Sequence, residues 1–392
     1  MGSRTEPDPA ARLLLLGARA RFDQTAEREL TALAEGPVDW ISIVGLAASE
    51  GTAPLLHSHL RQLDLLQRLP PFARRRLINI AQGVWAMNAA LMDHWAEATA
   101  VLRQAGVETL TLKGMALAQT IYPEAGVRPM ADIDLLVRPA ERADALEALR
   151  ALGYRTPGDD ADRFAASRSF AELVRDGTLI DLHWHAARYL RFEGIVRVDH
   201  DGIWRRARPL VTPAGRSLAL CPEDLLLHLI LHLTLGSEFA RVLWYADLDA
   251  VVRRYAAELD WERFVAEAER WRILALVGWT LGVVRESFDT PLPLGLLERL
   301  GRGRVRRAAV ARCIGASSPP GLRRWRADIR VYLAQTLLMD RPADVLRVLV
   351  WTFFPSSTWL RFHYEIEAPW RVPVYRAIHP FRVCWLASRQ LR

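Results

Sequence analysis

Residues 107–137 read VETLTLKGMALAQTIYPEAGVRPMADIDLLV, and this stretch decides the fold class. Its first six residues, Val107 to Leu112, are typical of a short strand. Lys113-Gly114 then predicts a turn into a short helix over 115–122, and a loop carrying Arg128 follows. Acidic and aliphatic side chains alternate from Asp132 to Val137, which is the period of a second strand.

The segments that follow predict the rest of a small mixed sheet. Pro139 is suited to the first position of a helix that reaches Leu152, where Gly153 ends it. Asp176-Gly177 is a favourable hairpin turn between strands expected over 164–174 and 179–185. Strand, helix, strand, helix and hairpin together indicate a compact α/β core.

Helical periodicity dominates on both sides of this core. Before it, Pro70-Pro71 opens a long helix expected over 72–104. After Pro209 the helical period returns, with helices expected over 222–232 and 240–255 and breaks at 291–293 and 317–320. We therefore predict an α+β fold in which a small mixed-sheet core is flanked by helices. The expected divisions are 1–105 (helical), 106–212 (core) and 213–392 (helical).

The basic residues single out one position. The chain has 52 Lys and Arg residues, and Lys113 is the one lysine among 51 arginines. Arginine does not replace lysine well where a compact ammonium must sit among phosphate oxygens. A surviving surface lysine is the plain alternative. Its place before Gly114 and upstream of Asp-Ile-Asp favours a chemical role.

Three acids form a candidate metal site. Asp132 and Asp134 lie two apart on a strand, so both project from the same face, where their charges repel unless a cation lies between them. Asp181 falls on another expected strand and completes the set if the two strands are neighbours. Carboxylate oxygens suit Mg²⁺, which then binds substrate phosphates. Two ions held in this way activate an attacking oxygen and stabilise a leaving pyrophosphate.

Phosphate-binding groups are expected beside these acids. Gly114 allows a close approach of the backbone, and the following helix offers free N–H groups at its N-terminus. Lys113 adds an ammonium, and Arg128 lies four residues before Asp132. No P-loop or dinucleotide-binding glycine motif is present in the sequence.

The motifs LKGMAL (112–117), VRPMADIDLLV (127–137) and IDLHWH (180–185) resemble the uncharacterised nucleotidyltransferase family of the polymerase β-like superfamily. PEDLLLH (222–228) and WYAD (244–247) are similar to the helical segment that follows the core in that family. The resemblance implies Asp132, Asp134 and Asp181 as ligands of catalytic Mg²⁺ and Lys113-Gly114 as the phosphate loop. The corresponding loop of the superfamily usually reads Gly-Ser. Because this chain has Lys-Gly instead, the resemblance does not decide which chemical group is transferred.

The resemblance implies a metal-dependent nucleotidyltransferase that uses a nucleoside triphosphate and a hydroxyl or phosphate acceptor. The acceptor would be a small molecule, a glycan or a modified peptide in a tailoring pathway, and nucleic acid is not expected. One alternative is phosphoryl or glycosyl transfer from a nucleotide or nucleotide sugar at the same site. A module that binds a nucleotide or a protein partner without turnover is the other.

Histidines near these motifs have two interpretations. His183 and His185 share a strand face with Asp181. They are half-buried strand residues or one of them, for which we take His183, contacts a substrate phosphate, and both interpretations are favoured over metal ligation. His228 and His232 are four apart on a helix, a spacing that can bind zinc, but no third ligand accompanies them. We therefore expect core histidines whose hydrogen bonds are satisfied by the sheet or by Asp247, with Arg241 pairing with Asp247.

The remaining composition sets the context. The formal net charge is +7, which attracts anions without choosing between them. Three distant cysteines predict neither a disulfide framework nor a zinc site, and we expect a reducing cytoplasm. No signal peptide and no membrane span are expected. The fourteen tryptophans, several of them C-terminal, are expected to pack an irregular helical domain.

Overall fold

The computed structural model describes residues 8–390 except 125, 158–169, 187–189, 302–307, 311, 314–328 and 367. The helix break expected at 317–320 and the start of the strand expected from 164 lie outside the described residues.

One six-stranded mixed sheet forms the centre of the α/β part. Its spatial order is β3-β4-β2-β1-β6-β5, with β2 parallel to β4 and antiparallel to β1. The strands are β1 (Leu110–Thr111), β2 (Asp132–Leu136), β3 (Phe170–Arg175), β4 (Thr178–His183), β5 (Arg208–Val211) and β6 (Arg216–Ala219).

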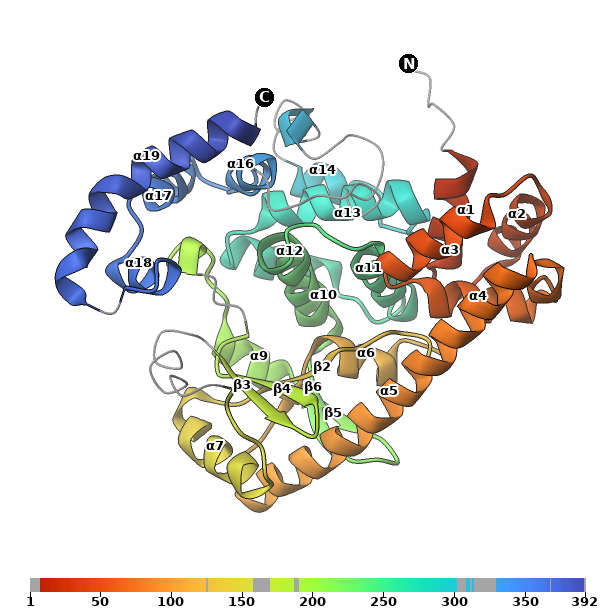
Figure 1. The fold of residues 1–392 in the computed structure, drawn as a ribbon, viewed down its shortest axis with the longest axis horizontal. Coiled ribbons are helices and arrows are strands. Elements are labelled where there is room, and N and C mark those ends of the chain that lie inside the picture. The colour runs from red at the N-terminus through yellow and green to blue at the C-terminus, as the bar shows by residue number, and fades with distance from the viewer. Residues whose placement is uncertain are drawn as a thin grey trace.

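Helices surround the sheet, as the α+β prediction required (Figure 1). Those before and within the sheet are α1 (Pro9–Gly17), α2 (Gln24–Glu35), α3 (Trp40–Ser49), α4 (Ala53–Gln62), α5 (Pro71–Gln104), α6 (Lys113–Thr120), α7 (Arg142–Ala151) and α9 (His200–Arg206). Those after it are α10 (Pro222–Leu231), α11 (Val242–Arg254), α12 (Trp261–Arg270), α13 (Leu274–Phe288), α14 (Leu296–Leu300), α16 (Ile329–Leu337), α17 (Pro342–Phe353), α18 (Ser357–His363) and α19 (Val372–Gln390).

The predicted hairpin and long helix are confirmed. Asp176 and Gly177 both have positive φ, 53° and 78°, as a tight hairpin turn requires. Helix α5 spans 34 residues, and Gly106 follows it with φ 77°.

One hairpin was missed by the sequence analysis. Strands β5 and β6 pair around a turn at 212–215, where a return of helical periodicity was expected, and β6 lies beyond residue 212. Each strand has only four residues, too few for the alternation of side chains to be recognised.

Helix α5 joins two apolar cores. Ala73 and Leu77 in its first turns pack into the core formed by the helices on both sides of the sheet. Trp95 and Leu102, further along, pack beneath the sheet with Ile133 and other strand residues. Figure 1 shows α5 running as a long diagonal from the N-terminal helices to the sheet. At 1.5 Å per residue its length is about 50 Å, enough to reach both cores.

A buried ion pair ties the loop before β2 to the helices. Arg128 Nε and Nη2 donate to Asp247 Oδ1 and Oδ2 at 2.9 and 2.7 Å, and Tyr122 Oη donates to Oδ1 at 2.6 Å. Arg128 is 5% exposed and Asp247, on α11, is 1% exposed. Asp247 thus pairs with Arg128, which corrects the expected pairing with Arg241.

In the part of the chain that the structure describes, we find no helix both long and apolar enough to cross a lipid bilayer.

Replacing Asp247 with Asn keeps its volume but leaves the buried Arg128 charge without its counterion. We expect the free energy of unfolding to fall by about 3 to 5 kcal/mol, measured by urea denaturation. Arg61→Ala, which removes the exposed Arg61–Glu124 pair, is the control and should cost about 1 kcal/mol or less. Equal effects of the two substitutions would contradict the importance of the buried pair.

Candidate active site

Adjacent parallel strands bring the acids together. Asp134 on β2 lies opposite Asp181 on β4, and Asp132 shares their face because it is two residues from Asp134. The intervening residues Ile133 and Ile180 point to the other face and are fully buried in the apolar core. Burial of one face therefore fixes the strand register, and the register places the carboxylates side by side.

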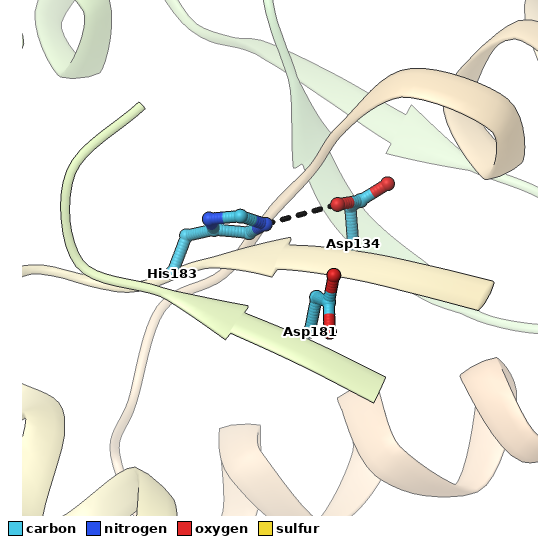
Figure 2. A group of neighbouring side chains, drawn as sticks. All are labelled: Asp134, Asp181 and His183. Carbon is cyan, nitrogen blue, oxygen red and sulfur yellow. Dashed lines mark hydrogen bonds and ion pairs between the residues drawn. The ribbon is translucent and has the colours of Figure 1, made fainter. Parts of the chain in front are cut away.

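Asp134 is the most enclosed member of the site. It is 2% exposed, and its Oδ1 accepts hydrogen bonds from Lys113 Nζ at 2.6 Å and from His183 Nε2 at 2.9 Å. Figure 2 shows the imidazole of His183, on β4, reaching across to Asp134 on β2. Asp181 lies on β4 as well. Burial alone would raise the pKa of Asp134, but Lys113 and His183 lower it well below its usual range. Asp134 is therefore ionised at neutral pH.

The backbone before Lys113 positions its side chain beside the Asp134 carboxylate. The Leu112 amide donates to the Asp134 carbonyl at 3.0 Å, which continues the β1–β2 pairing by one residue. Lys113 then begins α6 with φ 42°, in the left-handed region that side chains rarely adopt. Such strain persists where the surroundings enforce it, and it is concentrated at functional sites.

Gly114 allows Arg128 to lie against the start of α6. A Cβ at this position would be 2.7 Å from Arg128 Nη1 and 3.2 Å from Met130 Cγ. Arg128 cannot easily move away, because Asp247 holds its guanidinium from the other side. The glycine is thus needed for a close contact within the protein, in addition to the phosphate approach expected from the sequence.

The structure brings a metal-binding geometry together. One ligand atom each from Asp134, Asp181 and His183 lies within 4.8 Å of the others. Asp181 Oδ1 is buried and has no hydrogen-bond partner among the described residues. A buried oxygen of this kind is expected where a cation can bind. Two carboxylates and an imidazole suit a divalent ion, so the residues present could hold a divalent metal.

The other two carboxylates hold protons more tightly than usual. Burial, with the charges of Asp134 and Asp132, raises the pKa of Asp181 to about 7. Burial, with the charge of Asp134, raises the pKa of Asp132 to about 6. A bound cation would relieve this repulsion, since an opposite charge favours the ionised form.

The structure shows what three of the expected site residues contact. His183, expected to contact a phosphate, donates a hydrogen bond to Asp134 and is one of the three residues that could hold a metal ion. Arg128, expected to contact phosphate, is occupied by Asp247 through two of its nitrogens. His185 leaves the strand and packs against His200, with ring centroids 5.0 Å apart.

His228 is a buried residue whose surroundings the sequence analysis judged wrongly. It is 2% exposed on α10, and neither ring nitrogen has a hydrogen-bond partner among the described residues, so it is not a satisfied core histidine. Burial, and next the charge of Lys113, lowers its pKa well below the usual value. His232, one turn on, interacts with Ser237 and packs against Trp244. The four-residue spacing of His228 and His232 was the available signal in the sequence. Only the fold shows that α10 lies near Lys113 and Asp134, whose charges act on His228.

Acids on two neighbouring strands of the mixed sheet thus lie beside the lysine and glycine that begin α6, and three of the side chains here could hold a divalent ion. The model of the uncharacterised nucleotidyltransferase family matches residues 36–289, which is more than half of the chain. The protein therefore belongs to this family. No curated protein and no solved structure matches it.

In the metal-free protein, the raised pKa of Asp181 has a consequence for stability. The proton on Asp181 stabilises the fold below pH 4, and this contribution is lost as pH rises through about 7. Asp181→Asn, which is neutral throughout, should therefore raise the free energy of unfolding at pH 8 by about 1 to 3 kcal/mol and change it little at pH 4. Urea denaturation in a chelator measures this.

Asp176→Asn is the control for that experiment, because Asp176 lies on the same hairpin with an 80% exposed side chain. It should leave stability unchanged at both pH values. Destabilisation by Asp181→Asn at pH 8 would contradict the assignment of Asp181 as an uncompensated buried charge.

Proposed function

We propose that this protein is a metal-dependent nucleotidyltransferase that moves a nucleotidyl group from a nucleoside triphosphate to a hydroxyl or phosphate acceptor. The observation that carries the proposal is the cluster of Asp134, Asp181 and His183 beside Lys113, at the start of α6. Family membership supports the same reaction class. The acceptor would be a small molecule, a glycan or a modified peptide.

Asp134, Asp181 and His183 would hold one divalent ion, and Asp132, on the same face of β2, would contribute to a second. Such ions neutralise phosphate charge and stabilise a leaving pyrophosphate. Mg²⁺ is the ion that the family implies. The imidazole of His183 also suits Mn²⁺ or another transition metal, because nitrogen ligands favour these ions over Mg²⁺.

Lys113 would bind the phosphates of the donor. Its ammonium lies at Asp134, next to the carboxylates that would hold the metal, and its residue begins α6, whose N-terminus carries a positive partial charge. A compact ammonium with three donors suits this place better than a planar guanidinium. Arg128 would position Gly114 and the loop before β2 rather than touch the phosphates.

Asp181 would hold one of the ions and help to deprotonate the attacking hydroxyl, because its carboxylate lies beside those of Asp134 and Asp132 on the same face of the sheet. Asp134, whose pKa is lowered, would stay ionised and keep its role in metal binding throughout.

Transfer of a phosphoryl or glycosyl group at the same residues is the second candidate. The sequence Lys113-Gly114 supports this second candidate, because it departs from the Gly-Ser that is usual in the superfamily. A third possibility is a module that binds nucleotide without turnover. The presence of all three acids with Lys113 and Gly114 favours a working site over a degenerate one.

Asp134→Asn tests the metal site directly. We expect Mg²⁺- or Mn²⁺-dependent nucleotide turnover to fall at least about 100-fold, because one ligand charge is lost where the metal balances phosphate. Comparing α-labelled with γ-labelled ATP shows which part of the donor reaches the product. Asp176→Asn should keep full activity. Unchanged turnover in Asp134→Asn would refute a catalytic metal at this carboxylate.

Lys113→Arg tests the need for an ammonium. It keeps the charge but replaces a point donor with a planar fork, so we expect kcat/KM for the nucleotide to drop by about tenfold or more. Thermal melting should show that the fold is retained. Full activity in this variant would mean that the single lysine has no special chemical role.

A further inference from the structure

Helix α19 displays a continuous apolar stripe to solvent. Trp370, just before the helix, and Val374, Ile378, Phe381 and Trp385 along it are between 46% and 77% exposed. Their spacing of four, four, three and four residues places them on one side of the helix. From first to last, the stripe is about 22 Å long.

The opposite side of α19 is fixed to the protein. His379 is buried, with ring nitrogens that contact Tyr364 Oη at 2.7 Å and the Thr352 carbonyl at 3.0 Å. Val372 packs in a small core around Leu360 and Ile366. The helix is therefore held in place by α17 and α18, and its apolar stripe is left outside. Figure 1 shows α19 along the outer edge of the molecule, away from the sheet.

The charge beside the stripe has one sign. Residues 368–390 contain no aspartate or glutamate. At 100° per residue, Arg371, Arg382 and Arg389 form a row along one flank of the stripe. All three are exposed. The guanidinium of Arg371 lies 5.2 Å from the ring centroid of Trp370, and that of Arg389 lies 4.7 Å from that of Trp385.

We propose that α19 binds the surface of an anionic lipid bilayer, lying in its plane with the apolar stripe in the interface. Interfacial helices combine an aromatic and aliphatic face with arginines that meet anionic headgroups. Tryptophan is suited to the level of the headgroups. The proposal rests on α19 alone and is independent of the reaction at the sheet.

A second copy of the chain is a less suitable occupant of the stripe. Packing α19 against α19 would bring two rows of arginines together, with no carboxylate on either helix to pair with them. Like charges opposed in this way cost free energy. An anionic bilayer supplies both an apolar layer and the opposite charge.

Flotation with lipid vesicles tests the proposal on the full-length protein without nucleotide or metal. We expect binding to phosphatidylcholine vesicles containing 30% phosphatidylserine, about tenfold or more weaker binding to pure phosphatidylcholine, and weakening by salt. Phe381→Ser with Trp385→Ser should reduce binding at least about tenfold. Arg371→Gln with Arg382→Gln and Arg389→Gln should do the same.

Matched controls remove equal surface elsewhere. Trp85→Ser with Met87→Ser alters exposed apolar residues on α5, and Arg75→Gln with Arg76→Gln and Arg216→Gln removes three exposed charges. Both controls should bind vesicles like the wild type, and melting curves should show all variants folded. Failure of the wild type to float, or equal flotation of the stripe variants, would overturn the proposal. A dimer in light scattering that the stripe variants abolish, without vesicle binding, would assign the surface to a second copy instead.

Discussion

The buried ion pair between Arg128 and Asp247 is the constraint on which the site depends. Two charges removed from water are stable only when their geometry satisfies both, and here two nitrogens meet two oxygens with Tyr122 as a further donor. The pair joins the loop before β2 to α11. It also holds Arg128 against Gly114, and so aligns the start of α6 with the strand that carries Asp134. The start of α6 therefore takes its place beside the acids through a contact that also ties the loop before β2 to α11.

Charge at the site is left unbalanced. Asp132, Asp134 and Asp181 share one face of two strands, and Lys113 meets Asp134 directly. The neighbouring histidines do not compensate the other acids, because burial lowers the pKa of His183 and of His228 and keeps both neutral. Burial, together with this surplus of negative charge, raises the pKa of Asp132 and of Asp181. Such a surplus of buried negative charge costs stability, and a bound cation would relieve it.

The sequence predicted the elements whose signals are local. The turn at Asp176-Gly177 and the alternation around Asp132 and Asp134 depend on neighbouring residues, and the structure has the corresponding hairpin and strand. The pairing of Arg128 with Asp247 joins residues 119 positions apart, so no local sequence pattern predicts it. His228 faces the acids only because α10 is placed over the sheet, and β5 and β6 are too short for their periodicity to be read. Long-range packing decides these features.

The single lysine has a consequence beyond phosphate binding. Lys113 carries the one ε-amino group in the 392-residue chain, and its side chain is 18% exposed beside Asp134. Apart from the α-amino group, reagents that modify amines can therefore react with one side chain of this protein, and that side chain lies in the candidate active site. Acylation there would remove the positive charge that balances Asp134. In most proteins such modification is spread over the surface, whereas here it would fall on a side chain that contacts Asp134.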